Sequence, residues 1–183
     1  MACLKKLDSD ITFDCANLGI SGGIGEIDEA IIINSSDLST VADNGTGWAT
    51  VTMQTGKKGF LVNSVNNSIM YQDAIKVNDT TPPGEDQSVV IKILNNGFGF
   101  AADSPRRVVS QLLGGNFRVA FKSKTGLYFF AGAFCGLEAS DLATDSSTGG
   151  VSTITLKTPE AATGDVLLRI AKGDYDGLKI PKV

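Results

Sequence analysis

A change of hydrophobic periodicity within residues 104–134 is the feature that most constrains the fold of this chain. The segment SPRRVVSQLLGG (residues 104–115) begins with Ser104 and Pro105, residue types favoured at a helix start, and ends with two glycines, which favour a helix end. Its apolar residues recur at helical spacing and make one stripe: Val108, Val109, Leu112 and Leu113. The segment therefore predicts a short helix over residues 104–113.

The period changes directly after these glycines. In FRVAFK (residues 117–122), Phe117, Val119 and Phe121 fall on one face of a strand. SKTG follows as a turn, and LYFFAGAF (residues 127–134) is predicted to be a more fully apolar partner strand. Two strands joined through a glycine-containing turn indicate a hairpin. Helix and hairpin can bury a common face, so we expect this unit to form the core that the other strands cover.

The rest of the chain predicts short strands separated by polar turns. Strand candidates are residues 11–15, 27–34, 48–53, 88–94, 151–157 and 165–170, and residues 60–77 are predicted to be two strands around Asn66 and Asn67. Loops are predicted for residues 35–48, with a tight turn at Asn44-Gly45, and for residues 78–87 and 136–150. The tail, residues 171–183, is expected to lie over the body or to reach a neighbour. With about eight strands and one dominant helix, we expect a mainly β protein, a β-sandwich or barrel with one flanking helix, as a single domain over residues 1–183.

Composition limits the classes of function. The chain has 183 residues, of which 42% are hydrophobic and 20% charged, as in ordinary globular proteins. No apolar run approaches the roughly 20 residues of a membrane-spanning helix, so we expect no membrane insertion. The first residues, MACLKKLDSD, lack an apolar stretch after their lysines, so no secretory signal is predicted. A net charge of −4 argues against a general nucleic-acid-binding surface.

Neither a cofactor nor a metal site is predicted. The chain contains no histidine, which excludes Ser-His-Asp and Cys-His catalysis and most zinc sites. Cys3, Cys15 and Cys135 show no CxxC spacing, and we expect buried or half-buried thiols in a reducing compartment. The glycine-rich residues 17–29 contain neither GxGxxG nor GxxxxGK[ST] and precede a strand-like segment, so they do not indicate a phosphate-binding loop.

Two charged features allow both a structural and a functional interpretation. Acidic residues cluster at three places, where solvated turns are the simplest explanation and a carboxylate-dependent hydrolase is the alternative: Glu26/Asp28/Glu29, Glu85/Asp86 and Asp174/Asp176. Arg106 and Arg107 fall in the first turn of the predicted helix, where positive charge opposes the helix dipole. They are either solvated side chains or part of an interface or phosphate contact.

Two segments resemble a family of structural proteins. Residues 117–160, FRVAFKSKTGLYFFAGAFCGLEASDLATDSSTGGVSTITLKTPE, preceded by the helical VVSQLL, resemble the C-terminal part of tail-tube-like proteins of phages that infect Bacteroides-type bacteria, including crAss-like phages. The matching features are KTGLYFF, GLEAS, a TGG loop and the strand STITLKTPE. Residues 10–34, DITFDCANLGISGGIGEIDEAIIIN, are similar to the opening of the same proteins. Together the two segments cover about half of the chain.

This resemblance implies a β-sandwich of the tail-tube type with a flanking helix, assembled into a ring around a channel through which phage DNA passes. It implies a homo-oligomer, a hexamer or dodecamer, that contacts other tail or portal-connector proteins. The protein would be made in the host cytoplasm, would reside in the virion and would not be an enzyme. The strand-rich pattern is compatible with assembly into a ring. An edge strand can be completed by a neighbouring subunit, and a head-to-tail contact can close a ring. We expect loops 37–47 and 78–87 and the paired arginines to contact neighbouring subunits: Asp37, Asn44, Asn78, Pro82, Pro83, Glu85, Arg106 and Arg107.

Three other functions stay open at this stage. An auxiliary capsid or decoration protein would form monomers or trimers on the phage head. A carbohydrate-binding β-sandwich would need exposed aromatic platforms, whereas aromatic residues make up only 7% of this chain and most lie in strand-like runs. We expect Trp48, the single tryptophan, to lie in the core or on a sheet face rather than to serve as such a platform. A carboxylate-dependent hydrolase would depend on residues such as Asp28, Glu29, Asp174 and Asp176.

Overall fold

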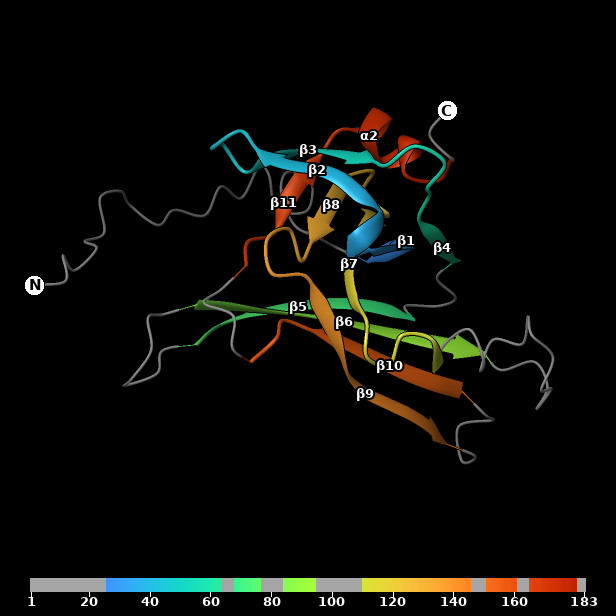
Figure 1. The fold of residues 1–183 in the computed structure, drawn as a ribbon. Coiled ribbons are helices and arrows are strands. Elements are labelled where there is room, and N and C mark those ends of the chain that lie inside the picture. Colours follow the sequence, from blue (N-terminus) through green and yellow to red (C-terminus); the bar gives the residue numbers. More distant parts are fainter. Residues whose placement is uncertain are drawn as a thin grey trace, which may run out of the picture.

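The computed structural model describes residues 26–63, 68–76, 84–94, 110–145, 151–160 and 165–180, and shows a mainly β protein (Figure 1). The short helical segments are the 3-10 turn η2 (Ser35–Asp37) and the helix α2 (Lys172–Gly177). The strands are β1 (Ile27–Asn34), β2 (Leu38–Asp43), β3 (Trp48–Met53), β4 (Phe60–Asn63), β5 (Ile69–Lys76), β6 (Gly84–Leu94), β7 (Asn116–Ser123), β8 (Tyr128–Ala131), β9 (Leu137–Asp145), β10 (Val151–Lys157) and β11 (Leu168–Ile170). The mainly β class predicted from the sequence is thus confirmed.

Hydrogen bonds connect these eleven strands into one sheet. Its main path has the order β2-β3-β11-β8-β7-β9-β10-β6-β5, and β1 joins as a branch that pairs with β7 and β4. The strand pairs are antiparallel except β3 with β11, which is parallel. The path ends at β2 and β5 and the branch ends at β4, so the sheet of described strands is open. In Figure 1, β5, β6, β9 and β10 lie as a lower group beneath β2, β3, β8 and β11, so the sheet folds into two layers.

Strand β7 is the point at which the sheet divides. One of its edges pairs with β1 along residues 117–123. Its other edge pairs first with β9, through Asn116 and Phe117, and then with β8, through residues 119–122. The loop 132–136 carries the chain from β8 to β9 and therefore from one layer towards the other.

The two faces of β1 and β7 are buried in different cores. Ala30 and Ile32 of β1 lie in a first core, which also contains side chains of β5, β6, β9 and β10. Ile31 and Ile33 point to the opposite face and lie in a second core with side chains of β3, β11 and α2. A strand that is buried on both faces needs a continuous apolar run rather than alternation, which explains the sequence AIII.

Aromatic contacts connect the hairpin to both cores. In the first core, the Phe121 ring lies 5.3 Å from that of Tyr71 and 5.4 Å from that of Phe129, measured between centroids. On the other face, the fully buried Tyr175 of α2 lies 4.9 Å from Tyr128. The described part of the tail therefore lies over the body, one of the two expected arrangements, and Tyr175 and Leu178 close the second core.

Several strand predictions are confirmed. β1, β3 and β10 span the predicted residues, and β7 and β8 form the predicted hairpin, with Phe121 opposite Phe129. Residues 60–77 contain two strands, β4 and β5, as expected. In β10 the predicted alternation is visible, because Ser152, Ile154 and Leu156 are buried while the intervening residues are half-buried.

Three predicted loops were wrong in part. β2 lies within residues 35–48, β9 occupies much of residues 136–150, and Gly84–Gln87 belong to β6, so Glu85 lies in a strand. β9 contains the turn-forming residues Ser, Asp and Thr, but Leu137, Ala139 and Leu142 contact the first core. A register shift opposite Thr155 and Leu156 breaks their spacing, which hid the alternation in the sequence.

The predicted helix over residues 104–113 lies mostly outside the described residues, as do the strand at 11–15 and the turn at Asn66 and Asn67. In its described part, the N–H of Leu113 donates to the carbonyl of Ser110 at 3.3 Å. Gly114 follows with φ +78°, the left-handed conformation predicted for a glycine at a helix end. Neither helix in the described part of the chain has the length and apolar character needed to cross a membrane.

We predict that Ile31→Ala lowers the free energy of unfolding by about 2–5 kcal/mol, because it leaves a cavity in the second core. Leu61→Ala is the matched control, since Leu61 lies directly opposite Ile31 on β4 but is 48% exposed. The control should cost about 1 kcal/mol or less. Urea unfolding of both variants tests this, and equal costs would contradict the assignment of Ile31 to a closed core.

Candidate functional site

The predicted contact residues Asp37 and Asn44 stabilise their own turns. The Asp37 carboxylate accepts a hydrogen bond from Asn34 Nδ2 at 2.8 Å and lies 3.2 Å from Lys57 Nζ. The bond from Asn34 and the charge of Lys57 lower the pKa of Asp37. Ionised Asp37 therefore adds stability above its unfolded pKa of about 4, which is lost as the pH falls through the lower folded pKa. Asn44 Oδ1 accepts bonds from the N–H of Thr46 at 2.9 Å and from its hydroxyl at 2.7 Å.

The other predicted contact residues are not brought together with these two. Glu85 lies in β6, opposite Ile75 of β5, and its carbonyl accepts the N–H of Asp165 at 3.3 Å. The remaining five lie outside the described residues: Asn78, Pro82, Pro83, Arg106 and Arg107. Their contact with a neighbouring subunit stays a prediction.

The acidic residues around β1 form ion pairs. Asp28 lies 2.7 Å from Lys122 Nζ, Glu26 pairs with Lys124, and Glu29 pairs with Lys179 at 2.5 Å. The hydrogen bond from Lys122 is the main cause that lowers the pKa of Asp28. Each carboxylate thus faces a lysine. In the described part of the chain, no group of three or more His, Cys, Asp or Glu side chains could hold a metal ion.

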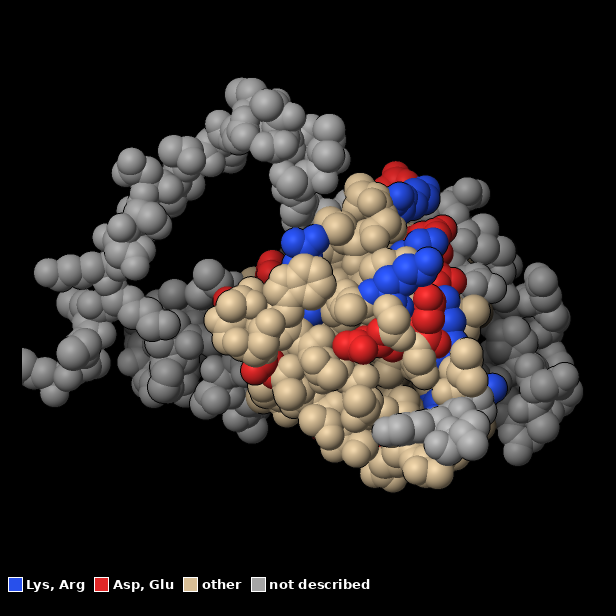
Figure 2. Space-filling view, turned by 90° about the horizontal axis from the view of Figure 1, so that it is seen from above, with Lys and Arg blue, Asp and Glu red and all other residues tan. Residues whose placement is uncertain are grey.

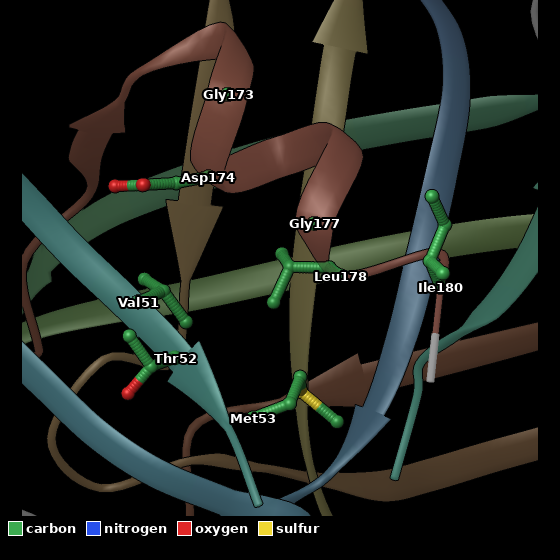
Figure 3. A pocket seen from close by; sticks show the side chains of 8 residues that line it. All are labelled: Val51, Thr52, Met53, Gly173, Asp174, Gly177, Leu178 and Ile180. Atoms are coloured by element: carbon green, nitrogen blue, oxygen red, sulfur yellow. The ribbon is translucent and has the colours of Figure 1, made fainter. Parts of the chain in front are cut away.

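A mostly apolar pocket of about 340 Å³ lies between β3 and α2 (Figure 3). We call it the β3–α2 pocket, and its lining residues are Val51, Thr52, Met53, Gly173, Asp174, Gly177, Leu178 and Ile180. Its floor is formed by the buried Val51, Met53 and Leu178. Figure 3 shows the carboxylate of Asp174 pointing away from Leu178 and Met53, so the acid lies at the rim. Ile180, which is 65% exposed, forms another part of the wall.

The edge strand β4 exposes large apolar side chains beside this pocket. Among the described strands β4 pairs only with β1, and Phe60 and Leu61 are 55% and 48% exposed. The N–H of Gly59 donates to the carbonyl of Leu178 at 2.7 Å, which places the start of β4 next to the end of α2. The edge at β2, by comparison, exposes mainly Ser39, Thr40 and Asp43. Phe60 and Leu61 are successive residues, so their side chains point to opposite faces of β4, on the sides of Ile32 and Ile31 respectively. We refer to the unpaired edge of β4, with these two side chains and the neighbouring Ile180, as the β4 edge surface.

A second exposed apolar feature is presented by the loop 132–136. Phe134 is 54% exposed, and Val166 nearby is 45% exposed. Both residues are held by the carboxylate of Asp165, which is only 1% exposed. This carboxylate accepts the backbone N–H groups of Phe134 at 3.2 Å, Cys135 at 3.0 Å and Val166 at 2.8 Å. A buried carboxylate is stable only when it is hydrogen-bonded or paired in this way.

Further side chains bind the remaining backbone groups of the loop. Gln87 Oε1 accepts the N–H of Gly132 at 2.7 Å. Asn116 Nδ2 donates to the carbonyl of Cys135 at 3.0 Å, and Arg118 Nε donates to that of Ala133 at 3.3 Å. Side chains from three elements therefore hold the backbone that carries Phe134. Cys135 itself is half-buried, as predicted, and burial raises the pKa of its thiol.

Sequence reasoning missed both the loop and the pocket. The apolar pattern of LYFFAGAF predicts a single strand, but β8 ends at Ala131 and the next glycine begins a turn. Gly132 and Gly136 have φ values of +73° and +72°, so the pair of glycines around AFC was the available signal. The pocket had no such signal, because its walls come from segments that are far apart in the chain.

Comparison of the chain with protein-family models, with curated proteins and with solved structures found no match in any of the three.

We predict that Gly136→Ala destabilises the protein more than Gly45→Ala does. Both glycines have positive φ, but a Cβ on Gly136 would lie 2.0 Å from Asn116 Oδ1, whereas nothing lies within 4 Å of one on Gly45. Gly45→Ala should cost about 1–2 kcal/mol from backbone strain alone. Gly136→Ala should cost roughly 1–3 kcal/mol more, because it also displaces the Asn116 bond to the loop. Chemical denaturation of both variants measures the difference, and equal costs would contradict a tightly held loop.

Proposed function

We propose that this protein is a non-enzymatic structural subunit of a phage virion, which assembles with copies of itself into a ring around the DNA channel of the tail or head–tail connection. The observation that carries the proposal is the open, apolar edge at β4. The family resemblance of residues 10–34 and 117–160 supports the same assignment.

The β4 edge has the properties of a surface that another chain covers. An edge strand presents unpaired N–H and C=O groups, and monomeric proteins protect such edges with charges, prolines or bulges. Within β4 the residues are Phe-Leu-Val-Asn, so the strand itself carries no charge or proline. Burying the exposed parts of Phe60 and Leu61 against a second chain would be favourable, since full burial of such side chains contributes about 1.5–3 kcal/mol each.

The layered β architecture supports a fold of the tail-tube type. One sheet folds into two layers over a first core, and among the described strands its ends at β2, β4 and β5 pair with no further strand. In this proposal the predicted helix at residues 104–113 is the flanking helix.

The charge distribution supports a wall past which DNA can move. Figure 2 shows basic and acidic side chains interleaved on one face of the molecule. Phosphate binding needs clustered Lys and Arg, and interleaved signs lower the local positive potential. The net charge of −4 acts in the same direction.

Two alternatives fit the geometry less well. The aromatic platform that a sugar-binding module needs would be Trp48, which is 41% exposed on a sheet strand, but the Arg169 guanidinium lies 5.0 Å from its ring centroid and covers one face. Of the four acids that a carboxylate-dependent hydrolase would use, Asp28, Glu29 and Asp176 lie in ion pairs with lysines. A decoration protein of the phage head remains the second candidate, because it too would bury an apolar edge.

We predict that the purified protein forms closed rings or stacked tubes with a central hole as its concentration rises, seen by light scattering and negative-stain imaging. Leu61→Lys should shift assembly to at least about tenfold higher concentration, because it places a charge on the edge that is buried in the ring. Leu113→Lys is the control, since Leu113 is 56% exposed but lies outside β4.

A protein that stays monomeric up to its solubility limit would contradict the proposal and favour the decoration protein or the sugar-binding module. Trimers without a central channel would favour the decoration protein. If Leu61→Lys and Leu113→Lys assemble equally well, rings form without the β4 edge, and the role proposed for this edge is wrong.

A further inference from the structure

We infer that Asn44 is a site of self-catalysed deamidation, in which the backbone nitrogen of Gly45 attacks the Asn44 side-chain amide and ammonia is released. The site lies in the turn between β2 and β3, and every residue from Ala42 to Trp48 is exposed. The inference concerns a chemical modification of the single chain, so it does not depend on the proposed ring.

The reaction consists of two steps and needs only water as co-reactant. In the first step the Gly45 N–H loses its proton, its nitrogen forms a bond to Cγ of Asn44, and the bond from Cγ to Nδ2 breaks. Nδ2 takes up a proton and leaves as ammonia, so a succinimide ring remains. In the second step water adds to either ring carbonyl and opens the ring to aspartate or isoaspartate. No atom is oxidised or reduced.

The attacking nitrogen has a base beside it. The N–H of Gly45 donates a hydrogen bond to Oδ1 of the Asp43 carboxylate at 2.9 Å. This distance is within the reach that a general base needs to accept a proton. Glycine also has no Cβ, so its nitrogen can approach another group closely. Asp43 is therefore placed to accept the proton as the new bond to Asn44 forms.

The carbonyl group that is attacked is surrounded by hydrogen-bond donors. Asn44 Oδ1 accepts the N–H of Thr46 at 2.9 Å, the hydroxyl of Thr46 at 2.7 Å and the N–H of Trp48 at 3.3 Å. Since backbone N–H groups only donate, the oxygen rather than the nitrogen of the amide must face them. Negative charge develops on this oxygen when its carbon is attacked, and donors that are already in place stabilise that charge.

The turn has room for the ring to form. Gly45 has a φ of +78°, and no atom lies within 4 Å of a Cβ built on it. Water therefore reaches the exposed turn directly from solvent. Asp43 acts on the nucleophile and Thr46 acts on the electrophile, an arrangement that the Asn-Gly sequence alone does not provide.

The products alter the turn. Aspartate adds a negative charge next to Asp43, and isoaspartate lengthens the backbone by a methylene group. The Asn44 N–H donates to the Trp48 carbonyl at 2.9 Å, and Asp43 pairs with Ala49 across the hairpin. Both contacts depend on the present length of the backbone, so accumulated isoaspartate should loosen the β2–β3 hairpin.

The test follows deamidation of the full-length protein at neutral pH by peptide mapping with mass spectrometry, and enzymatic methylation detects isoaspartate. The same chain unfolded in urea is the reference, because the turn is absent there. Asn44 should deamidate at least about fivefold faster in the folded protein than in urea. The sequence also contains Asn96-Gly97, which should react within about twofold of Asn44 in urea, where both lie in unfolded chain.

Three variants separate the contributions of the turn. Asp43→Asn keeps an oxygen that can accept the Gly45 N–H but removes the carboxylate, so Asn44 should react at least about fivefold more slowly. Thr46→Val removes the hydroxyl donor, keeps the shape of the side chain and should slow the reaction at least about threefold. Thr50→Val is the control, because Thr50 is also exposed but lies within β3, and it should leave the rate unchanged.

An Asn44 that stays intact in the folded protein while it deamidates in urea would overturn the inference, because the turn would then protect the amide. Equal rates in the folded and unfolded chains would overturn it too, since the Asn-Gly sequence alone would set the rate. An unchanged rate in Asp43→Asn would exclude the carboxylate as the base. Circular dichroism and thermal unfolding confirm that each variant is folded, so that a slower reaction in Asp43→Asn and Thr46→Val supports the assigned roles.

Discussion

The fold depends on the burial of β1, β7 and β8 on both faces. Side chains of β1 alternate between the two cores, with Ile32 in the first and Ile31 in the second. The same alternation places Phe121 and Phe129 in the first core and Phe130 in the second. A slip of one residue would exchange the two sets of side chains, so the register of these central strands is strongly specified. Both layers, and the helix α2, are positioned by that register.

Polar side chains bind the backbone at the turn where the chain passes from one layer to the other. The turn from β8 to β9 cannot use sheet hydrogen bonds, and its backbone groups would be costly to bury without partners. Asp165, Gln87, Asn116 and Arg118 supply those partners. The result is a loop with a fixed backbone that exposes Phe134.

The strands that sequence reasoning found are those whose pattern is local. Ile27–Asn34 contains the continuous apolar run Ala30–Ile33, and Val151–Lys157 alternates cleanly, so both strands were predicted with the observed bounds. β9 was missed because a bulge breaks its alternation and because its polar residues are typical of turns. Of the candidate contact residues, Asp37 and Asn44 were placed correctly near turns, but the structure uses their side chains within those turns. The pocket was beyond prediction, since Val51 and Leu178 meet only after the tail has packed on β3.

Local sequence patterns predict the mainly β class, the β7–β8 hairpin and the glycine at the end of the turn before β7. These features depend on periodicity and on backbone preferences, which act between residues close in the chain. Long-range contacts establish that β11 pairs in parallel with β3, that β4 pairs only with β1 among the described strands, and that Phe60 and Phe134 stay exposed. A pattern of apolar residues predicts that a side chain prefers burial. Whether the side chain is buried within one molecule depends on which distant segments of the chain pack against it.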